Sequence, residues 1–128
     1  MERILVVDDS ADNVAVLRAI LENAGYEVAS VLDPSLVFST VFEWKPQLIL
    51  MDVCMPGFDG PMVTRMLKRH ENLKNIPILF CSSLDESDLA KLASECGADG
   101  YTRKSASPRE IVTRVQTVLR RRPPGADA

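Results

Sequence analysis

The sequence predicts a single doubly wound α/β domain, (βα)5, with five parallel strands in one sheet and helices on both faces. Short apolar runs alternate with amphipathic helical patterns five times along the 128 residues, which is typical of such a sheet. This length suits one compact domain and is too short for two. Polar side chains follow the apolar runs, at the edge where doubly wound sheets place their ligands.

The first half of the chain predicts strands and helices in alternation. Beginning with a strand, the five elements are Ile4–Val7, Asp12–Ala24, Tyr26–Val31, Asp33–Trp44 and Leu48–Met51. The strands are apolar runs that are rich in β-branched residues, and the helices carry apolar residues at helical spacing. Gly25 ends the first helix. Asp33 and Pro34 supply the N-cap and the first residue of the second helix, which Pro46 ends.

The second half continues the alternation, after turn-forming residues 56–61. Beginning with a helix, the five elements are Val63–Leu67, Ile76–Cys81, Leu89–Cys96, Asp99–Arg103 and Ser107–Leu119. Gly97 ends the helix Leu89–Cys96. Residues 107–110 form a capping box, with proline at the first helical position, that begins the last helix. We expect Met62 and Met66 to fill gaps in the core.

Composition excludes several classes of protein. The chain is 46% hydrophobic and 26% charged, with a net charge of −3, so it has no basic footprint for direct nucleic-acid binding. Its apolar runs fall far short of the ~20 residues of a membrane helix, and it begins without a charged-then-apolar leader pattern, so we expect neither a membrane helix nor a leader peptide. We expect a domain over 1–121 and a tail or the start of a linker over 122–128.

The three cysteines favour free thiols. Their number is odd, no two form a CxxC pair, and the chain has one histidine, which disfavours a disulfide scaffold or a zinc site. We expect Cys81 and Cys96 to be small core residues. Reduced thiols indicate a cytoplasmic protein.

Three aspartates follow predicted strands and define a candidate metal site. Asp8 and Asp9 come after the first strand, and Asp52 comes after the third. Because these strands are expected neighbours, the carboxylates should converge on one shallow pocket. Two like charges ~4 Å apart cost about 4 kcal/mol at an effective dielectric of 20, so a cation should be present. Oxygen ligands favour Mg²⁺ or Mn²⁺.

Two further groups suit phosphoryl chemistry at this edge. Ser82 follows the fourth strand and offers a hydroxyl donor, and Lys104 follows the fifth and offers an ammonium group. Each residue alone has an ordinary interpretation: an N-cap for Asp9, a turn residue for Ser82, a surface lysine for Lys104. Five such groups at four strand ends favour a shared site with a carboxylate nucleophile.

Four motifs resemble the receiver domain of response regulators in two-component signal transduction. They are VVDDS, LILMDVCMPGFDG, ILFCSS and DGYTRK, at residues 6–10, 48–60, 78–83 and 99–104. The family's spacing recurs, with 30 residues from Asp52 to Ser82 and 22 from Ser82 to Lys104, and the resemblance covers residues 2–121. It implies a flavodoxin-like sheet with strand order 2-1-3-4-5.

The resemblance also implies how the acidic residues act. Asp52 would be the phosphoacceptor and would take a phosphoryl group from the phosphohistidine of a histidine kinase. Asp9, Asp52 and the backbone carbonyl of Cys54 would bind Mg²⁺ directly. Asp8 would act mainly through water.

The same resemblance implies a switch. Lys104 would pair with Asp52 and then with the phosphoryl group. Ser82 would move toward a phosphoryl oxygen and Tyr101 would swing inward behind it, which would remodel the face of the fourth helix, fifth strand and fifth helix. The implied partners are a sensor histidine kinase or phosphotransfer protein, a downstream target protein or effector domain, and a second copy in a phosphorylation-dependent homodimer. Such a domain has at most self-phosphorylation and self-dephosphorylation activity.

Two residues depart from the family pattern. Ser105 follows Lys104 where the family usually has proline, so we expect either a trans loop or a strained one there. Ser83 stands where alanine or glycine is common, and we expect it to crowd or screen the phosphoryl site.

Three other classes of protein are alternatives. An aspartyl phosphohydrolase places a second acid two residues after its nucleophile, where this chain has Cys54 or Ser10. A flavodoxin-like cofactor carrier needs a phosphate loop after the first strand, where Asp8 and Asp9 would repel the phosphate. A pseudo-receiver, which binds partners without phosphorylation, is kept open by Ser105.

Overall fold

The computed structural model describes residues 1–55, 57 and 59–121 of the chain. Its elements are, in order, β1 (Arg3–Val7), α1 (Ala11–Asn23), β2 (Glu27–Val31), a 3₁₀ turn (Pro34–Leu36), α2 (Val37–Trp44), β3 (Leu48–Asp52), α3 (Gly60–Arg69), β4 (Ile78–Ser82), α4 (Glu86–Cys96), β5 (Gly100–Arg103) and α5 (Pro108–Arg120). Strand and helix alternate as predicted.

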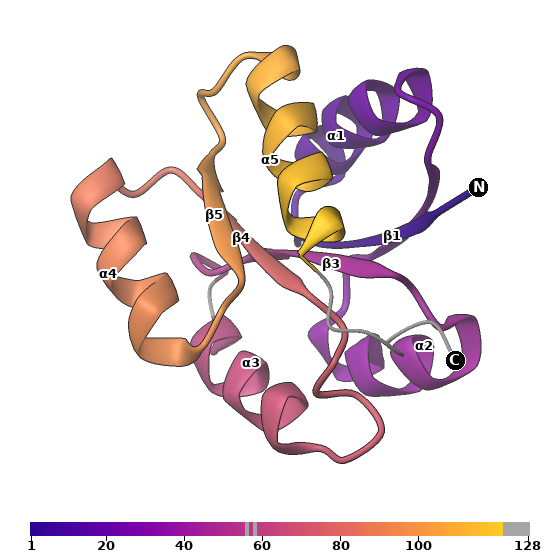
Figure 1. The fold of residues 1–128 in the computed structure, drawn as a ribbon, viewed down its shortest axis with the longest axis vertical. Coiled ribbons are helices and arrows are strands. Elements are labelled where there is room, and N and C mark those ends of the chain that lie inside the picture. The colour runs from indigo at the N-terminus through magenta and orange to yellow at the C-terminus, as the bar shows by residue number, and fades with distance from the viewer. Residues whose placement is uncertain (56, 58, 122–128) are drawn as a thin grey trace.

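The five strands form one parallel sheet in the order β2-β1-β3-β4-β5. Helices α1 and α5 cover one face, and α2, α3 and α4 cover the other (Figure 1). The predicted doubly wound, flavodoxin-like architecture is therefore confirmed.

Two hydrophobic cores lie on opposite faces of the sheet. Alternate strand residues point to opposite sides, so Leu5 and Phe80 pack with α2, α3 and α4, whereas Ile4 and Leu79 pack with α1 and α5. Because both faces are covered, every residue of β3 and β4 is buried. This explains why the strands are continuous apolar runs in the sequence.

The start of α2 differs from the prediction. Asp33 does not cap an α-helix: its Oδ1 accepts hydrogen bonds from the Ser35 backbone N–H at 3.0 Å and the Ser35 hydroxyl at 2.8 Å. This local pairing begins the 3₁₀ turn at Pro34, and α2 starts only at Val37, without a side-chain cap.

The prediction for two methionines is wrong. Met62 and Met66 are 49% and 48% exposed, because α3 turns Val63 and Leu67 toward the core instead. Cys81 and Cys96 are buried, as expected. Among the described residues, no helix combines the length and apolar character that a bilayer crossing requires. The predicted tail at 122–128 lies outside the described residues.

Candidate functional site

The sheet register brings the predicted polar residues to one edge. Asp8 follows the last residue of β1, and β1 pairs with β3, whose last residue is Asp52. Ser82 is the last residue of β4 and is the register partner of Arg103 at the end of β5, directly before Lys104. Four neighbouring strands thus end in reactive side chains.

The three carboxylates form a compact cluster. Asp8, Asp9 and Asp52 each offer an oxygen, and these oxygens all lie within 4.8 Å of one another. Asp8 and Asp52 are only 1% and 3% exposed, whereas Asp9 is exposed. The backbone N–H of Ser10 donates to Asp8 Oδ1 at 2.9 Å, and that of Cys54 donates to Asp52 Oδ1 at 3.0 Å. Each buried carboxylate is therefore oriented by the N–H group two residues later.

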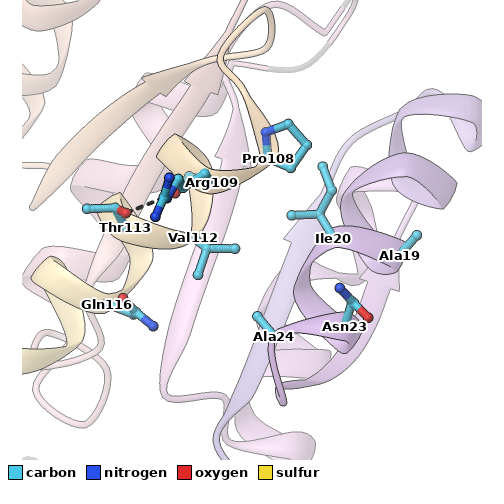
Figure 2. Close-up of a pocket in the computed structure, with 9 residues that line it drawn as sticks. All are labelled: Ala19, Ile20, Asn23, Ala24, Pro108, Arg109, Val112, Thr113 and Gln116. Atoms are coloured by element: carbon cyan, nitrogen blue, oxygen red, sulfur yellow. Dashed lines mark hydrogen bonds between the residues drawn. The ribbon is translucent and has the colours of Figure 1, made fainter.

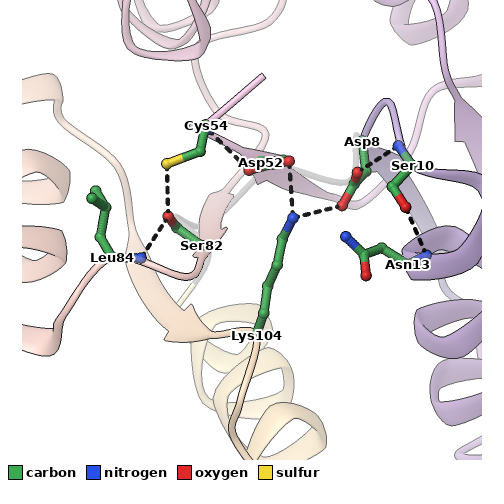
Figure 3. Close-up of polar contacts among 8 residues, drawn as sticks. All are labelled: Asp8, Ser10, Asn13, Asp52, Cys54, Ser82, Leu84 and Lys104. Atoms are coloured by element: carbon green, nitrogen blue, oxygen red, sulfur yellow. Dashed lines mark hydrogen bonds and ion pairs between the residues drawn. The ribbon is translucent and has the colours of Figure 1, made fainter. Parts of the chain in front are cut away.

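Lys104 lies between the two buried carboxylates (Figure 3). Its Nζ is 3.0 Å from Asp52 Oδ2 and 3.2 Å from Asp8 Oδ2. Burial alone would lower the pKa of Lys104, but the hydrogen bond and charge of Asp52, with the charge of Asp8, raise it above its ordinary value of 10.5. No described peptide bond is cis, so the bond to Ser105 is trans and the lysine reaches the cluster without proline.

Cys54 and Ser82 make a contact that the sequence did not indicate. Cys54 Sγ lies 3.2 Å from Ser82 Oγ, and the Ser82 hydroxyl also accepts a hydrogen bond from Leu84 N–H at 3.1 Å (Figure 3). Ser82 is fully buried, whereas Cys54 is exposed. Ser83 is exposed too, and no described contact joins it to the cluster.

Tyr101 lies on β5, as the register partner of Phe80 in β4, and is partly buried. The Arg114 guanidinium carbon lies 5.0 Å from the centre of its ring, within range for a cation–π contact. Arg114 also faces Glu86 of α4 at 3.9 Å and Glu110 of α5 at 3.7 Å. The Glu110–Arg114 spacing of four residues on a helix was the one sequence feature that could have indicated this cluster.

Two buried residues, Gly60 and Cys81, lie next to Asp52. An added Cβ at Gly60 would lie 2.9 Å from the Asp52 carbonyl oxygen and 3.3 Å from Val53 Cα, so α3 begins directly against the end of β3. Cys81 is the register partner of Asp52 on β4. Burial raises the pKa of the Cys81 thiol to about 12. The Met55–Pro56 turn of the motif lies partly outside the described residues.

The cluster fits a hard divalent cation. The described donors are carboxylate oxygens, the ligands that Mg²⁺ prefers. Lys104 supplies one positive charge against three negative ones. Asp8 Oδ2 is buried and makes no hydrogen bond with the described residues, although it faces Lys104 as an ion pair. A cation would satisfy this oxygen and the remaining negative charge.

A groove of about 730 Å³ lies elsewhere, between α1 and α5 (Figure 2). Ile20 and Ala24 line one side, and Pro108 and Val112 line the other. Its lining residues include no carboxylate, and Arg109 is the one charged residue among them. The groove lining therefore offers no carboxylate that could serve as a nucleophile or a metal ligand.

Comparison with known proteins identifies relatives along the whole domain. A family model of the response regulator receiver domain matches residues 4–116. The chain is 40% identical over 122 residues to the phosphate regulon transcriptional regulatory protein PhoB of Pseudomonas aeruginosa, covering 95% of this chain and 53% of that protein. It is 38% identical over 120 residues to the alkaline phosphatase synthesis transcriptional regulatory protein PhoP of Bacillus subtilis, covering 94% and 49%. The chain therefore spans about half the length of these relatives.

Solved structures share the fold. The chemotaxis response regulator CheY4 of Vibrio cholerae has a TM-score of 0.83 at 25% identity, over 92% of this chain and 98% of that chain. The BeF3-activated N-terminal receiver domain of Klebsiella pneumoniae RstA has a TM-score of 0.83 at 26% identity, over 94% and 100%.

Proposed function

Because the chain belongs to the family of response regulator receiver domains, a class of phosphorylation-controlled regulatory domains, we propose that Asp52 is its phosphoacceptor. One observation carries this proposal: Asp52 is a buried carboxylate at a strand end, held by the Cys54 N–H on one oxygen and by Lys104 on the other. Both contacts fix the group while leaving it next to two further aspartates.

In the proposed reaction, an Asp52 carboxylate oxygen attacks the phosphorus of a phosphohistidine on a sensor kinase or phosphotransfer protein. The P–N bond breaks, its electron pair returns to the imidazole nitrogen, and an aspartyl phosphate results. Lys104 then forms an ion pair with the phosphoryl group, which carries about −1.5 to −2 charge. Self-phosphorylation by a small phosphodonor would use the same attack.

Asp8, Asp9, Asp52 and the backbone carbonyl of Cys54 would hold a divalent cation. When bound, Mg²⁺ or Mn²⁺ would compensate the negative charge of the carboxylates and of the incoming phosphoryl group. The chain's own contribution is to orient Asp8 and Asp52 through local N–H groups and to offset their mutual repulsion with Lys104.

The output is proposed to arise on the face formed by α4, β5 and α5. Ser82 would give its hydroxyl to the phosphoryl group, and Tyr101 would move inward into the space behind it. Arg114, which spans Tyr101 and the first turn of α4, would then lose its ring contact. This change would present a new surface to a target protein, an effector domain or a second copy of the chain.

The proposed unit is a receiver domain over residues 1–121, followed by a tail or linker. The relatives' names describe transcriptional regulators, and the chain covers about half of their length. We therefore assign DNA contact, if the whole protein makes any, to a segment other than this acidic domain. The three free thiols favour a cytoplasmic setting.

Acetyl phosphate with Mg²⁺, followed by intact-mass measurement, tests the proposal. The wild type should gain one phosphoryl group, Asp52→Asn should gain none, and Asp12→Asn, an exposed control on α1, should behave as the wild type. A wild type that gains nothing under these conditions would favour a pseudo-receiver and refute the assignment of Asp52.

A further inference from the structure

We propose that Cys54 is a positioning residue for this switch: its thiol holds the Ser82 hydroxyl in the unphosphorylated position. A phosphoryl group on Asp52 must then compete with sulfur for that hydroxyl. The inference rests on the proposed function and deepens it, because it names the group that opposes the switch before phosphorylation.

The contact joins residues that are far apart in sequence. Cys54 Sγ and Ser82 Oγ lie 3.2 Å apart, within hydrogen-bonding distance, across 28 residues of chain. Ser82 is fully buried, so its hydroxyl must find its partners among protein atoms. Among the described residues, its two partners are the thiol and Leu84 N–H.

The bonding capacity of the hydroxyl gives the thiol its effect. A serine hydroxyl has one proton to donate and two lone pairs. Leu84 N–H donates to one lone pair of the hydroxyl oxygen. The Cys54 thiol either accepts the hydroxyl proton or donates to the other lone pair. Among the described residues, no hydrogen bond joins Ser82 to Asp52. The unphosphorylated hydroxyl is thus engaged away from the acceptor.

The competition is weighted toward the phosphorylated state. Sulfur is a weak donor and a weak acceptor, whereas phosphoryl oxygens are strong, charged acceptors. The hydroxyl can therefore leave Cys54 at small cost. A stronger hydrogen-bonding group at residue 54 would oppose the movement of Ser82 toward the phosphoryl group. A side chain without such a group would favour that movement.

Mutation can separate this effect from an effect on the acceptor. Cys54 holds Asp52 through its backbone N–H, at 3.0 Å, and holds Ser82 through its side chain. A change of side chain at residue 54 leaves the backbone contact available. Alanine removes the hydrogen-bonding group, and serine retains one.

Binding of beryllofluoride, a phosphoryl mimic, tests the inference without any hydrolytic step. Its affinity for the full chain in Mg²⁺ is measured by fluorine NMR for the wild type, Cys54→Ala, Cys54→Ser, Ser82→Ala and the Cys54→Ala/Ser82→Ala double variant. We expect Cys54→Ala to bind about two- to threefold more tightly, the low end of the range for one hydrogen bond, because sulfur is a weak partner. Cys54→Ser, whose hydroxyl is a stronger partner than a thiol, should bind no more tightly than the wild type. Cys54→Ala should have no effect once Ser82 is alanine.

Several outcomes would overturn the inference. One is equal affinity of the wild type and Cys54→Ala for beryllofluoride. Another is the same gain in affinity from Cys54→Ala in the wild type and in Ser82→Ala, which would indicate a steric effect. Cys96→Ala, at the opposite end of α4 from this edge, is the matched control and should not change the affinity. If Ser82→Ala does not fold, equal effects of alanine and serine at residue 54 would overturn the inference instead.

A second measurement separates this inference from the proposed function. Without Mg²⁺ or mimic, a double-mutant cycle in urea unfolding should give a coupling between Cys54 and Ser82 that differs from zero. Binding by the wild type, lost in Asp52→Asn, together with zero coupling would overturn the positioning role alone. No binding by the wild type would overturn the proposed function, and this inference with it.

Discussion

Replacing Lys104 by methionine should destabilise the fold by about 2–4 kcal/mol when divalent ions are absent. The change keeps much of the side-chain volume but leaves Asp8 and Asp52, both buried, facing each other without a cation. Lys104 Nζ lies 3.0 and 3.2 Å from their oxygens, and each contact is worth about 5 kcal/mol by Coulomb's law at an effective dielectric of 20. Desolvation of the three groups offsets part of this gain. Losing one partner of a buried pair costs about 3–5 kcal/mol, and the 24% exposure of the Lys104 side chain reduces that cost.

Urea unfolding in the presence of a chelator measures the loss. Adding Mg²⁺ should stabilise Lys104→Met more than the wild type, because the variant site has lost its competing positive charge. The pKa of Lys104 is raised in the folded state, so its contribution is complete below the ordinary value of 10.5 and is lost as the pH rises above it. The wild type and the variant should therefore converge in stability in strong alkali.

An exposed ion pair provides the control for this prediction. Lys74 and Glu71 are 3.3 Å apart, but their side chains are 45% and 85% exposed, so Lys74→Met should change stability by less than about 0.5 kcal/mol. If Lys104→Met unfolds within about 0.5 kcal/mol of the wild type, the two buried carboxylates do not depend on the lysine and the electrostatic argument fails.

Three further changes test other parts of the structure. Gly60→Ala should lower the free energy of unfolding by about 1–3 kcal/mol, because its Cβ would meet β3 backbone at 2.9 Å; an unaltered urea midpoint would contradict this packing. Arg114→Ala should lower the free energy of unfolding by about 0.5–1 kcal/mol, because it removes the contact with the Tyr101 ring. The freed ring should also tighten beryllofluoride binding, and Arg114→Lys should lie between the wild type and Arg114→Ala in both measurements. A thiol reagent at pH ~8 should label Cys54 in the native protein and Cys81, whose pKa burial raises to about 12, only on unfolding. Rapid native labelling of Cys81 would show that this core opens.

The sheet and the acidic cluster were predictable because each leaves a local trace in the sequence. A strand covered on both faces is a continuous apolar run, as in Leu48–Met51, and the charged Asp52 marks its carboxyl end. The convergence of Asp8, Asp9 and Asp52 then follows from strand order.

Other features depend on side-chain directions that periodicity does not determine. Met62 and Met66 have the spacing of a buried face, yet small rotations of a helix decide which apolar residues turn inward, and α3 buries Val63 and Leu67. The thiol of Cys54 meets a hydroxyl 28 residues away, and only the packed β3 and β4 ends bring them together.

The sheet register has a consequence for how such a chain can diverge. Each reactive group lies within two residues of a strand end at one rim, and a one-residue slip within a strand would point its side chain to the opposite face. The loops that lead from helices into strands, such as residues 70–77 between α3 and β4, lie at the other rim. We therefore expect insertions and fusion junctions to be tolerated better at the rim that carries these loops, because they leave the reactive groups at the opposite rim in place.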